Sequence, residues 1–399
     1  MLKRLFNTDF LIGITLAFML VLPFEYVLIK LSILLFSIVV CFLRRRIHFN
    51  IYLFRWTLLY IWGNLIAFTV GLIYANPAPS RYISTYFIWP ILYFLVFSSV
   101  NLSFYDSFRR VLKYATYVVV GMGLCACAYF NLNQVLEGEF LGLSPAVRPG
   151  FPILTPSGGN VDSMVFLYSY LIIYSIHKSS YNFPLLLSCI VFILITSNRA
   201  MYASIFLTLV LYFLFCLYVK NKNSHKVMRI MGYMGLFIVL IVFVLQYYGL
   251  FSFTELSDFF SEISESSDSH RSSQFVSLIN GWKNAPLLGN GTGVNASVVR
   301  SDTLPGFYEL TYLALLFERG ILGFLLYVFL ILSFNIRALK VAKRKPLMQE
   351  YILPLLVAVD MILLANAVNN YTLCFDYIWI LFIIFPLLKK NNYENMCRN

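Results

Sequence analysis

Glu309 is the residue of this sequence best placed for acid–base chemistry. It stands in "YELTYLALLFERGILG" (308–323), where the longest polar stretch of the chain meets an apolar run. A carboxylate at such a boundary can accept the proton of a hydroxyl group as that hydroxyl attacks a substrate. It can also be an ordinary acid at a helix start, where the helix dipole favours negative charge. Both interpretations remain open at this point.

Four arginines are the candidate anion-binding residues. Arg199 lies in "ITSNRAMYASIF", between two apolar runs, and Arg271 follows His270 at the start of an expected helix. Arg148 in "AVRPGFP" and Arg81 in "APSRYIS" are weaker candidates. An arginine near a membrane surface is costly unless it faces an anion or an acid, and its planar guanidinium suits phosphate. The alternative is that these side chains extend into water at the interface.

The elements that must position these residues are membrane-spanning helices. Hydrophobic residues make up 60% of the 399 positions, charged residues 12%, and the mean hydropathy is +0.77. Apolar runs of about 20 residues, enough to cross a hydrocarbon core, recur along the chain. The fold class is therefore an all-α polytopic membrane protein, and continuous apolar runs argue against a β-barrel. The twelve expected spans are approximately 9–23, 25–43, 51–74, 82–100, 111–130, 160–176, 182–197, 200–219, 230–250, 308–335, 350–367 and 371–388.

The distribution of basic residues predicts which side each segment faces. With the N-terminus inside, the expected cytoplasmic segments hold 21 Lys and Arg residues and the outer side holds eight. This bias predicts that both termini are cytoplasmic. The basic N-terminal stretch lacks a small-x-small cleavage site and continues into apolar sequence, so it is expected to be an uncleaved first span. "LRRR" (43–46) and "ALKVAKRK" (338–345) then anchor the topology and contact anionic lipids, so the net charge of +12 implies no nucleic-acid partner.

Two long segments are expected on the outer side of a single membrane domain that covers 1–399. The first is 131–159, rich in Pro and Gly, and the second is 251–307. In the second, apolar residues recur at helical spacing in 253–263 and in 275–282, and Asp268–His270 are a plausible cap before the second helix. A connection of this length is usually functional.

Several other chemistries find little support in the sequence. The seven cysteines lie mostly in apolar runs, which argues against a disulfide framework or a cysteine metal site. The four histidines form no recognisable metal motif, so we expect neither a metal nor another cofactor. "GNGTG" (289–293) follows no expected strand and is interpreted as a close turn or a helix cap instead of a nucleotide-binding loop. Asp360 and Asp376, within apolar spans, indicate either a polar pathway, as in a transporter, or pairing between helices.

Three motifs in order resemble those of the O-antigen ligase and polymerase (Wzy/WaaL) superfamily. The first is "TSNRAMYASIF", with Arg199 at the arginine of a Ser-Arg-Gly element. The second is "HRSSQFVSLINGWKNAPLLGNGTG", similar to the family's arginine, helix and Pro-Leu-Leu-Gly-x-Gly-x-Gly. The third resembles His-Asn-x-Tyr-Leu followed by Glu-x-Gly-x-x-Gly, and the matching positions are Tyr312, Leu313, Glu318, Gly320 and Gly323. The resemblance covers 190–330 well and the first half of the chain only in topology.

The resemblance implies a metal-independent, inverting glycosyl transfer at the periplasmic face of a bacterial inner membrane. An O-antigen polymerase would join oligosaccharide repeat units carried on undecaprenyl pyrophosphate, with a GT-C-like fold and the late loop over a cavity. Arg199 and Arg271 would bind the pyrophosphate and Glu309 would activate the acceptor hydroxyl. Trp89 and Tyr312 would hold lipid and stack on sugar rings. Membrane lipids, a chain-length regulator and a flippase are the other partners implied.

The sequence departs from the family pattern where the ligases carry histidine, because Glu309 occupies that position. The departure favours a polymerase over a ligase that transfers polysaccharide to lipid A-core. A polysaccharide flippase or another transporter is the third alternative, although such proteins seldom need so long a loop on one side. The second part of the third motif, from Glu318 to Gly323, also has a purely structural explanation. Gly320 and Gly323 would let another helix approach, and Glu318–Arg319 would be a local charge pair near the mouth.

Overall fold

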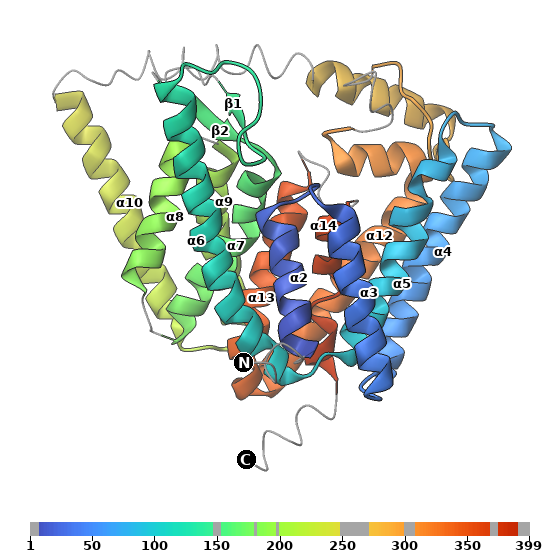
Figure 1. Ribbon diagram of the computed structural model, residues 1–399, viewed down its shortest axis with the longest axis horizontal. Helices are drawn as coiled ribbons and strands as arrows, with labels where there is room; N and C mark the ends of the chain where they lie inside the picture. Colours follow the sequence, from blue (N-terminus) through green and yellow to red (C-terminus); the bar gives the residue numbers. More distant parts are fainter. Residues whose placement is uncertain are drawn as a thin grey trace.

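A computed structural model describes residues 8–146, 153–178, 182–196, 199–247, 271–298, 308–367 and 374–389. Helices dominate these residues, as the apolar runs predict (Figure 1). The first half contains α2 (Thr8–Val21), α3 (Val27–Leu43), α4 (Ile51–Ile73), the short η1 (Pro79–Tyr82) and η2 (Ser84–Ile88), α5 (Trp89–Ser99) and α6 (Leu102–Leu132). A small antiparallel hairpin, β1 (Ser144–Ala146) and β2 (Thr155–Ser157), follows in the first expected outer loop.

The second half contains α7 (Gly159–Lys178), α8 (Phe183–Thr196), α9 (Arg199–Val219), α10 (Asn223–Tyr247), a helix that includes 271–284, α12 (Thr311–Arg344) and α13 (Pro346–Ala365). It ends with α14 (Phe375–Ile378), η3 (Trp379–Leu381) and η4 (Phe385–Leu388). The helix predicted over 275–282 is therefore confirmed. The expected helix at 253–263 and its neighbouring cap at Asp268–His270 lie outside the described residues.

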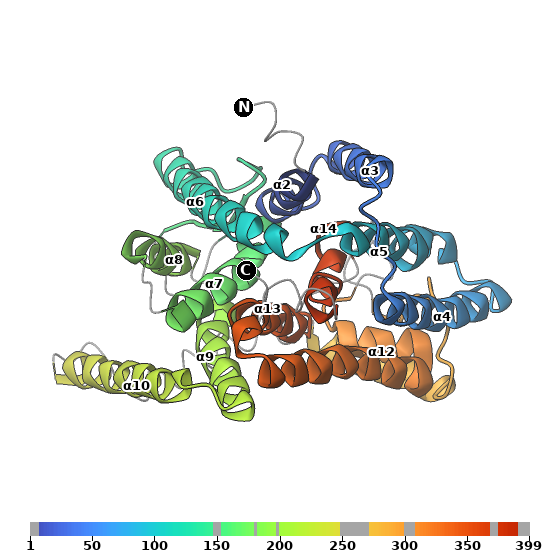
Figure 2. The ribbon, with the colours of Figure 1, turned by 90° about the horizontal axis from the view of Figure 1, so that it is seen from below.

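The centre of the bundle is α13. It packs against α7, α9 and α12, and Figure 2 shows these helices around it. Every residue from 352 to 359 is buried, so all faces of this helix are covered by protein. A helix that is apolar all round is buried, either among other helices, as here, or in the lipid of a membrane.

The last expected span differs from the prediction. Instead of one continuous helix over 371–388, the described part consists of α14, η3 and η4, and residues 375–388 are all buried. Irregular backbone at membrane depth is tolerated where protein encloses it. Over the described residues, four helices are long and apolar enough to cross a membrane, namely α4, α6, α12 and α13, and several shorter helices are apolar.

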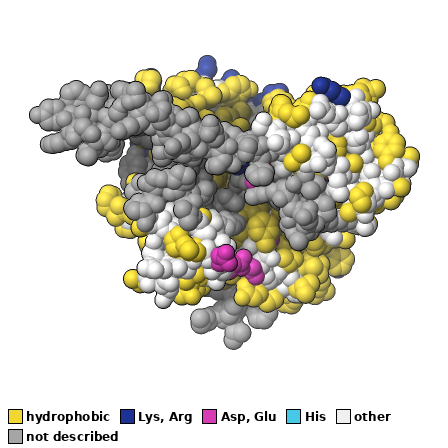
Figure 3. Space-filling model, turned by 90° about the horizontal axis from the view of Figure 1, so that it is seen from above, with side chains coloured by type: hydrophobic (Ala, Val, Ile, Leu, Met, Phe, Trp, Pro, Cys, Tyr) yellow, Lys and Arg dark blue, Asp and Glu magenta, His cyan; other side chains and the backbone are white. Residues whose placement is uncertain are grey.

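The two ends of the bundle differ in charge. The basic end, as we call it, is where α3, α5 and α12 end, and it holds Arg44–Arg46 and the cations from Arg337 to Lys345. Contacts at this end join distant segments, because Arg46 donates to Thr8 at 2.7 Å and Lys389 donates to the Ser98 carbonyl at 2.9 Å. The opposite end, the loop end, carries β1, β2 and 271–298 (Figure 1). Figure 3 shows that its described surface is mainly hydrophobic or neutral, with only small scattered groups of charge.

Candidate functional site

Arg271 and Glu309, which belong to different sequence motifs, meet at the loop end. The Arg271 Nε donates to the Glu309 Oε2 at 2.8 Å. Arg271 begins the described part of the 271–284 helix, and Glu309 lies two residues before α12. The Arg271 side chain is 40% exposed and that of Glu309 is 17% exposed, so the pair lies at the surface of the fold. A charge-assisted bond of this kind holds the carboxylate in a defined orientation.

A small apolar cluster supports this ion pair. It joins the 271–284 helix to the start of α12 and consists of Leu278, Ala296, Tyr308, Ala314 and Phe317. Tyr308 accepts a hydrogen bond from the Ala296 backbone N–H at 2.6 Å. The Glu309 backbone N–H donates to the buried Gln274 side chain at 3.2 Å. Hydrogen bonds at Tyr308 and at the backbone N–H of Glu309 therefore fix the chain around the candidate base.

The remaining predicted residues have different settings. The Tyr312 hydroxyl donates to the Leu363 carbonyl of α13, so this group contacts backbone, and a role in sugar binding stays a prediction. Arg199 is the first residue of α9 and Arg81 lies in η1, but their side chains are outside the described part of the structure. Arg148 is also outside it. Of the four predicted arginines, the described structure therefore brings one, Arg271, to Glu309.

The glycine-rich "GNGTG" segment forms a tight turn against a break in α12, which confirms the predicted turn. Gly289, Gly291 and Gly293 have φ values of 76°, 79° and 77°. Opposite them, Gly320 has φ 62° and ψ −175°, a conformation that is essentially restricted to glycine. In Figure 1 the first part of α12, before this break, lies across the bundle.

Loop and helix exchange hydrogen bonds at the break. Asn290 and Gly291 donate their backbone N–H groups to the carbonyls of Phe317 and Glu318 at 3.0 and 2.9 Å. In return, Ile321 donates to the Pro286 carbonyl at 2.9 Å. A broken helix in an apolar environment requires such replacement partners for its backbone.

The expectation that Gly320 and Gly323 admit another helix is wrong. A Cβ at Gly320 would lie 2.3 Å from the Leu287 carbonyl oxygen, so the close neighbour is the loop. A Cβ at Gly323 would lie 2.5 Å from the Cβ of Arg319 in the same helix. The positive φ at Gly320 causes both differences, because it interrupts the regular helix surface against which a second helix would pack.

The break also places two charged residues, Glu318 and Arg319, inside the protein. Their exposed fractions are 3% and 5%. Glu318 and Arg319 attract each other electrostatically, in line with the expected local charge pair, but no direct ion-pair contact joins them among the described residues. Both also contact Tyr86 of η2. The Tyr86 hydroxyl donates to the Glu318 carboxylate at 3.2 Å, and the Arg319 guanidinium lies 4.8 Å from the centre of the Tyr86 ring.

Arg319 is the functional candidate that our sequence analysis missed. Its Nε and one terminal nitrogen have no hydrogen-bond partner within the described structure, although they are buried. Buried guanidinium nitrogens that lack an acceptor are expensive, and a bound anion would provide the missing acceptors. The signal in the sequence was a pair of charges within an apolar run, which usually indicates function.

The two acids deep in apolar spans have partners on other helices. Asp360 accepts from the Asn335 side chain at 2.9 Å, which joins α13 to α12. Asp376 forms a buried ion pair with Lys30 and also accepts from the Phe24 backbone at 2.9 Å. Pairing between helices, one of the two explanations that we considered, therefore accounts for both acids.

Within the residues that the structure describes, no group of three or more His, Cys, Asp and Glu side chains could hold a metal ion. His177, for example, is hydrogen-bonded to the Tyr212 hydroxyl at 2.9 Å. Metal independence stays a prediction for the chain as a whole.

Comparison with known protein families agrees with the geometry. Residues 184–328 match the family model described as O-antigen ligase. This range contains Arg199, Arg271, Glu309, the glycine turn and the break in α12. No curated protein matches the chain. Over these residues the chain is similar to the O-antigen ligase and polymerase (Wzy/WaaL) superfamily, which contains both polymerases and ligases.

Proposed function

We propose that this protein is an O-antigen polymerase that joins undecaprenyl-pyrophosphate-linked oligosaccharide repeat units at the periplasmic face of the bacterial inner membrane. The observation that carries the proposal is the 2.8 Å ion pair between Arg271 and Glu309. It brings a proton acceptor and an anion-binding group together at the loop end, opposite the basic end. The positive-inside rule assigns the basic end to the cytoplasm.

The proposed reaction transfers a growing glycan to one lipid-linked repeat unit. A hydroxyl oxygen of the acceptor sugar attacks the anomeric carbon of the donor, and the bond from that carbon to the pyrophosphate oxygen breaks. Glu309 accepts the hydroxyl proton, and undecaprenyl pyrophosphate leaves with the electron pair. Attack from the side opposite the leaving group inverts the anomeric centre.

Arginines supply the electrostatic stabilisation in this proposal. The pyrophosphate gains negative charge as it leaves, and preorganised cations lower the energy of that transition state. Arg271 is 40% exposed, so a pyrophosphate can reach it beside Glu309. Arg199 and Arg319 are the further candidates, Arg199 from its family motif and Arg319 from its buried, unpartnered nitrogens. We also propose that the chain crosses the membrane twelve times and has a GT-C-like arrangement of helices.

Glu309 supports a polymerase over a ligase. The ligases carry histidine at the position that Glu309 occupies in the motif that this chain resembles. A carboxylate fixed by an arginine can accept a proton as histidine does, so the chemistry is retained while the ligase signature is not. The pairing of Asp360 and Asp376 with other helices leaves the transporter alternative without a specific observation in its favour.

The test is a lipopolysaccharide gel from the source bacterium. Wild type, a deletion strain, and the deletion complemented with Glu309→Gln or Arg271→Lys would be compared at equal protein level. Glu139→Gln is the matched control, because it removes an exposed acid elsewhere at the loop end. We expect the deletion to leave lipid A-core with a single repeat unit, and Glu309→Gln to lower polymer formation by about 10²- to 10⁴-fold.

Each alternative gives a different gel. Bare core with polymer accumulating on its lipid carrier would show a ligase. Absence of any repeat unit at the outer face would show a transporter. A full ladder from Glu309→Gln would refute the assignment of the base.

A further inference from the structure

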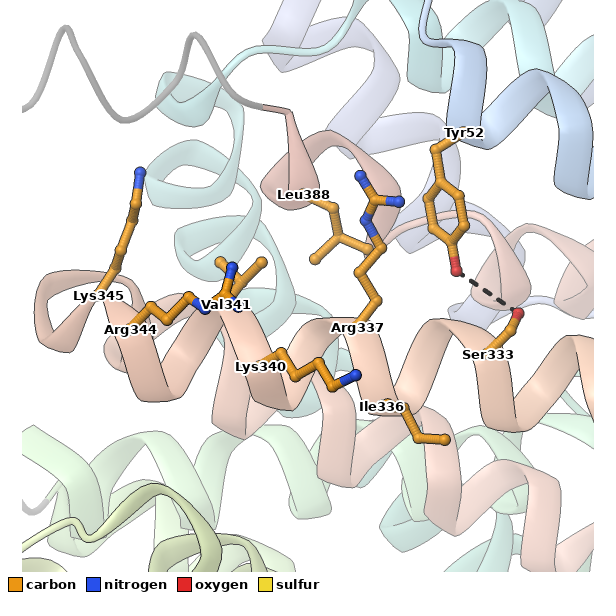
Figure 4. Close-up of a pocket in the computed structure, with 9 residues that line it drawn as sticks. All are labelled: Tyr52, Ser333, Ile336, Arg337, Lys340, Val341, Arg344, Lys345 and Leu388. Carbon is orange, nitrogen blue, oxygen red and sulfur yellow. Dashed lines mark hydrogen bonds between the residues drawn. The ribbon is translucent and has the colours of Figure 1, made fainter.

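A concave basic surface lies at the basic end, where α12 ends. It borders an open cavity of about 710 Å³, and Figure 4 shows its lining residues along the end of α12, on α4 and at the end of η4. We call this surface the basic groove. The residues that line it include Tyr52, Arg337, Lys340, Arg344, Lys345 and Leu388. The loop-end site described above shares none of these residues.

The groove concentrates positive charge. Arg337, Lys340 and Arg344 are spaced three and four residues apart, so they share one face of α12. Among the residues that the structure describes, no acid lines the groove. In the described part of the chain, none of these three cations has an ion-pair partner. A concave surface that carries one sign of charge attracts ions of the opposite sign.

Other cations at the basic end are neutralised. Arg46 pairs with Asp9 at 3.4 Å, and Arg109 pairs with Asp106 at 3.1 Å. Lys178 pairs with Glu350. The positive-inside rule explains why basic residues occur at this end. It does not explain why Arg337, Lys340 and Arg344 have no ion-pair partner within the described residues when other cations nearby have one.

One cation of the groove is held in place. The Arg337 guanidinium lies 3.9 Å from the centre of the Tyr52 ring, a cation–π contact between α12 and α4. The Tyr52 hydroxyl donates in turn to the Ser333 hydroxyl at 3.5 Å. Apolar side chains, including Leu388, line the cavity beside the charges. The lining therefore matches a molecule with both an anionic and an apolar part.

The length of α12 places the groove near a membrane surface. From Ile321, just after the break, to Arg344 is 24 residues, or about 36 Å of helix. This exceeds a hydrocarbon core of about 30 Å, so the last turns reach the lipid headgroups. Basic pockets between helices at the cytoplasmic side bind anionic headgroups in other membrane proteins.

We propose that the basic groove binds the phosphodiester headgroup of an anionic phospholipid. Lys340 and Arg344 contact the phosphate oxygens, Arg337 is held beside them by Tyr52, and the apolar lining accommodates the glycerol and the first methylenes of the lipid. Soluble phosphate shares the charged part of this ligand but lacks its apolar part.

The experiment measures lipid binding to the purified full-length protein by native mass spectrometry. Detergent-solubilised protein is titrated with phosphatidylglycerol or with phosphatidylcholine, and the affinity is compared with that of Lys340→Gln/Arg344→Gln. The matched control is Lys220→Gln/Lys222→Gln, which removes two exposed charges from the turn between α9 and α10. We expect the groove variant to bind phosphatidylglycerol roughly thirtyfold more weakly, while the control binds as wild type does.

The outcomes separate the possible sources of the anion. Equal loss of binding in both variants would overturn the proposal, because binding would then follow overall charge. No loss in either variant would also overturn it, because the groove would then make no contribution. Binding of phosphatidylcholine as tight as that of phosphatidylglycerol would also overturn it. Glycerol 3-phosphate is added as a competitor, and displacement of the lipid at equal concentration would show a site for soluble phosphate instead.

Discussion

Replacing Gly320 with alanine tests how the glycine turn and the break in α12 depend on each other. At φ 62° and ψ −175° an alanine is strained by about 1–3 kcal/mol. Its Cβ would also lie 2.3 Å from the Leu287 carbonyl oxygen and 2.5 Å from the Gly289 nitrogen. Overpacking of this kind costs about 1–3 kcal/mol more. The total of about 2–6 kcal/mol is a large part of a typical stability of about 5–15 kcal/mol.

Thermal unfolding of the purified protein in one detergent, followed by tryptophan fluorescence, measures this effect. We expect Gly320→Ala to unfold at a temperature several degrees below wild type. Gly121→Ala is the control, because Gly121 lies inside α6 and a Cβ there meets no atom within 4 Å. Alanine at that position should leave stability unchanged or raise it by up to about 1 kcal/mol. A Gly320→Ala protein as stable as wild type would refute the reasoning.

Three other changes have defined outcomes. Asp376→Asn should cost about 3–5 kcal/mol in thermal unfolding because it leaves Lys30 buried without its anion, whereas Lys30→Met/Asp376→Leu should recover most of that loss. Arg319→Met should unfold at or above the wild-type temperature yet lose at least about tenfold in polymer formation on a lipopolysaccharide gel; full activity would show a purely structural role. Burial lowers the pKa of Lys389 to about 8 from 10.5, so the unfolded chain binds that proton more tightly than the folded protein does. The free energy of unfolding should therefore rise as the pH is raised from about 8 to 10.5. Lys389→Met should therefore be more stable than wild type at pH 7 in denaturant unfolding, with the difference shrinking towards pH 10.5; a difference independent of pH would contradict this.

Much of the fold was predictable because it depends on local patterns. Apolar runs predicted helices, and the described helices follow those runs closely, from α2 at Thr8–Val21 to α13 at Pro346–Ala365. The turn at 289–293 was predictable from glycine and asparagine content, since such residues adopt positive φ at low cost. The irregular end of the chain was not predictable, because α14, η3 and η4 are as apolar as a regular span and differ only in what encloses them.

The candidate site was predictable in part. Glu309 and Arg271 were each identified from their own motif, and the structure brings them to 2.8 Å. Arg319 was dismissed as half of a local pair, because neighbouring charges in a sequence suggest mutual neutralisation. Both residues directly precede the break at Gly320, and Tyr86 contacts both.

The sequence by itself determined that this chain forms apolar helices, roughly where they lie along the chain, and which ends carry positive charge. Only the tertiary structure decided which polar groups meet. Arg271 and Glu309 are 38 residues apart, Tyr86 and Glu318 are 232 apart, and Lys30 and Asp376 are 346 apart. Helix periodicity is a local property of the chain, whereas these contacts depend on how helices pack side by side. Charges in an apolar interior then take the partners that packing supplies, because a buried charge without a partner is costly.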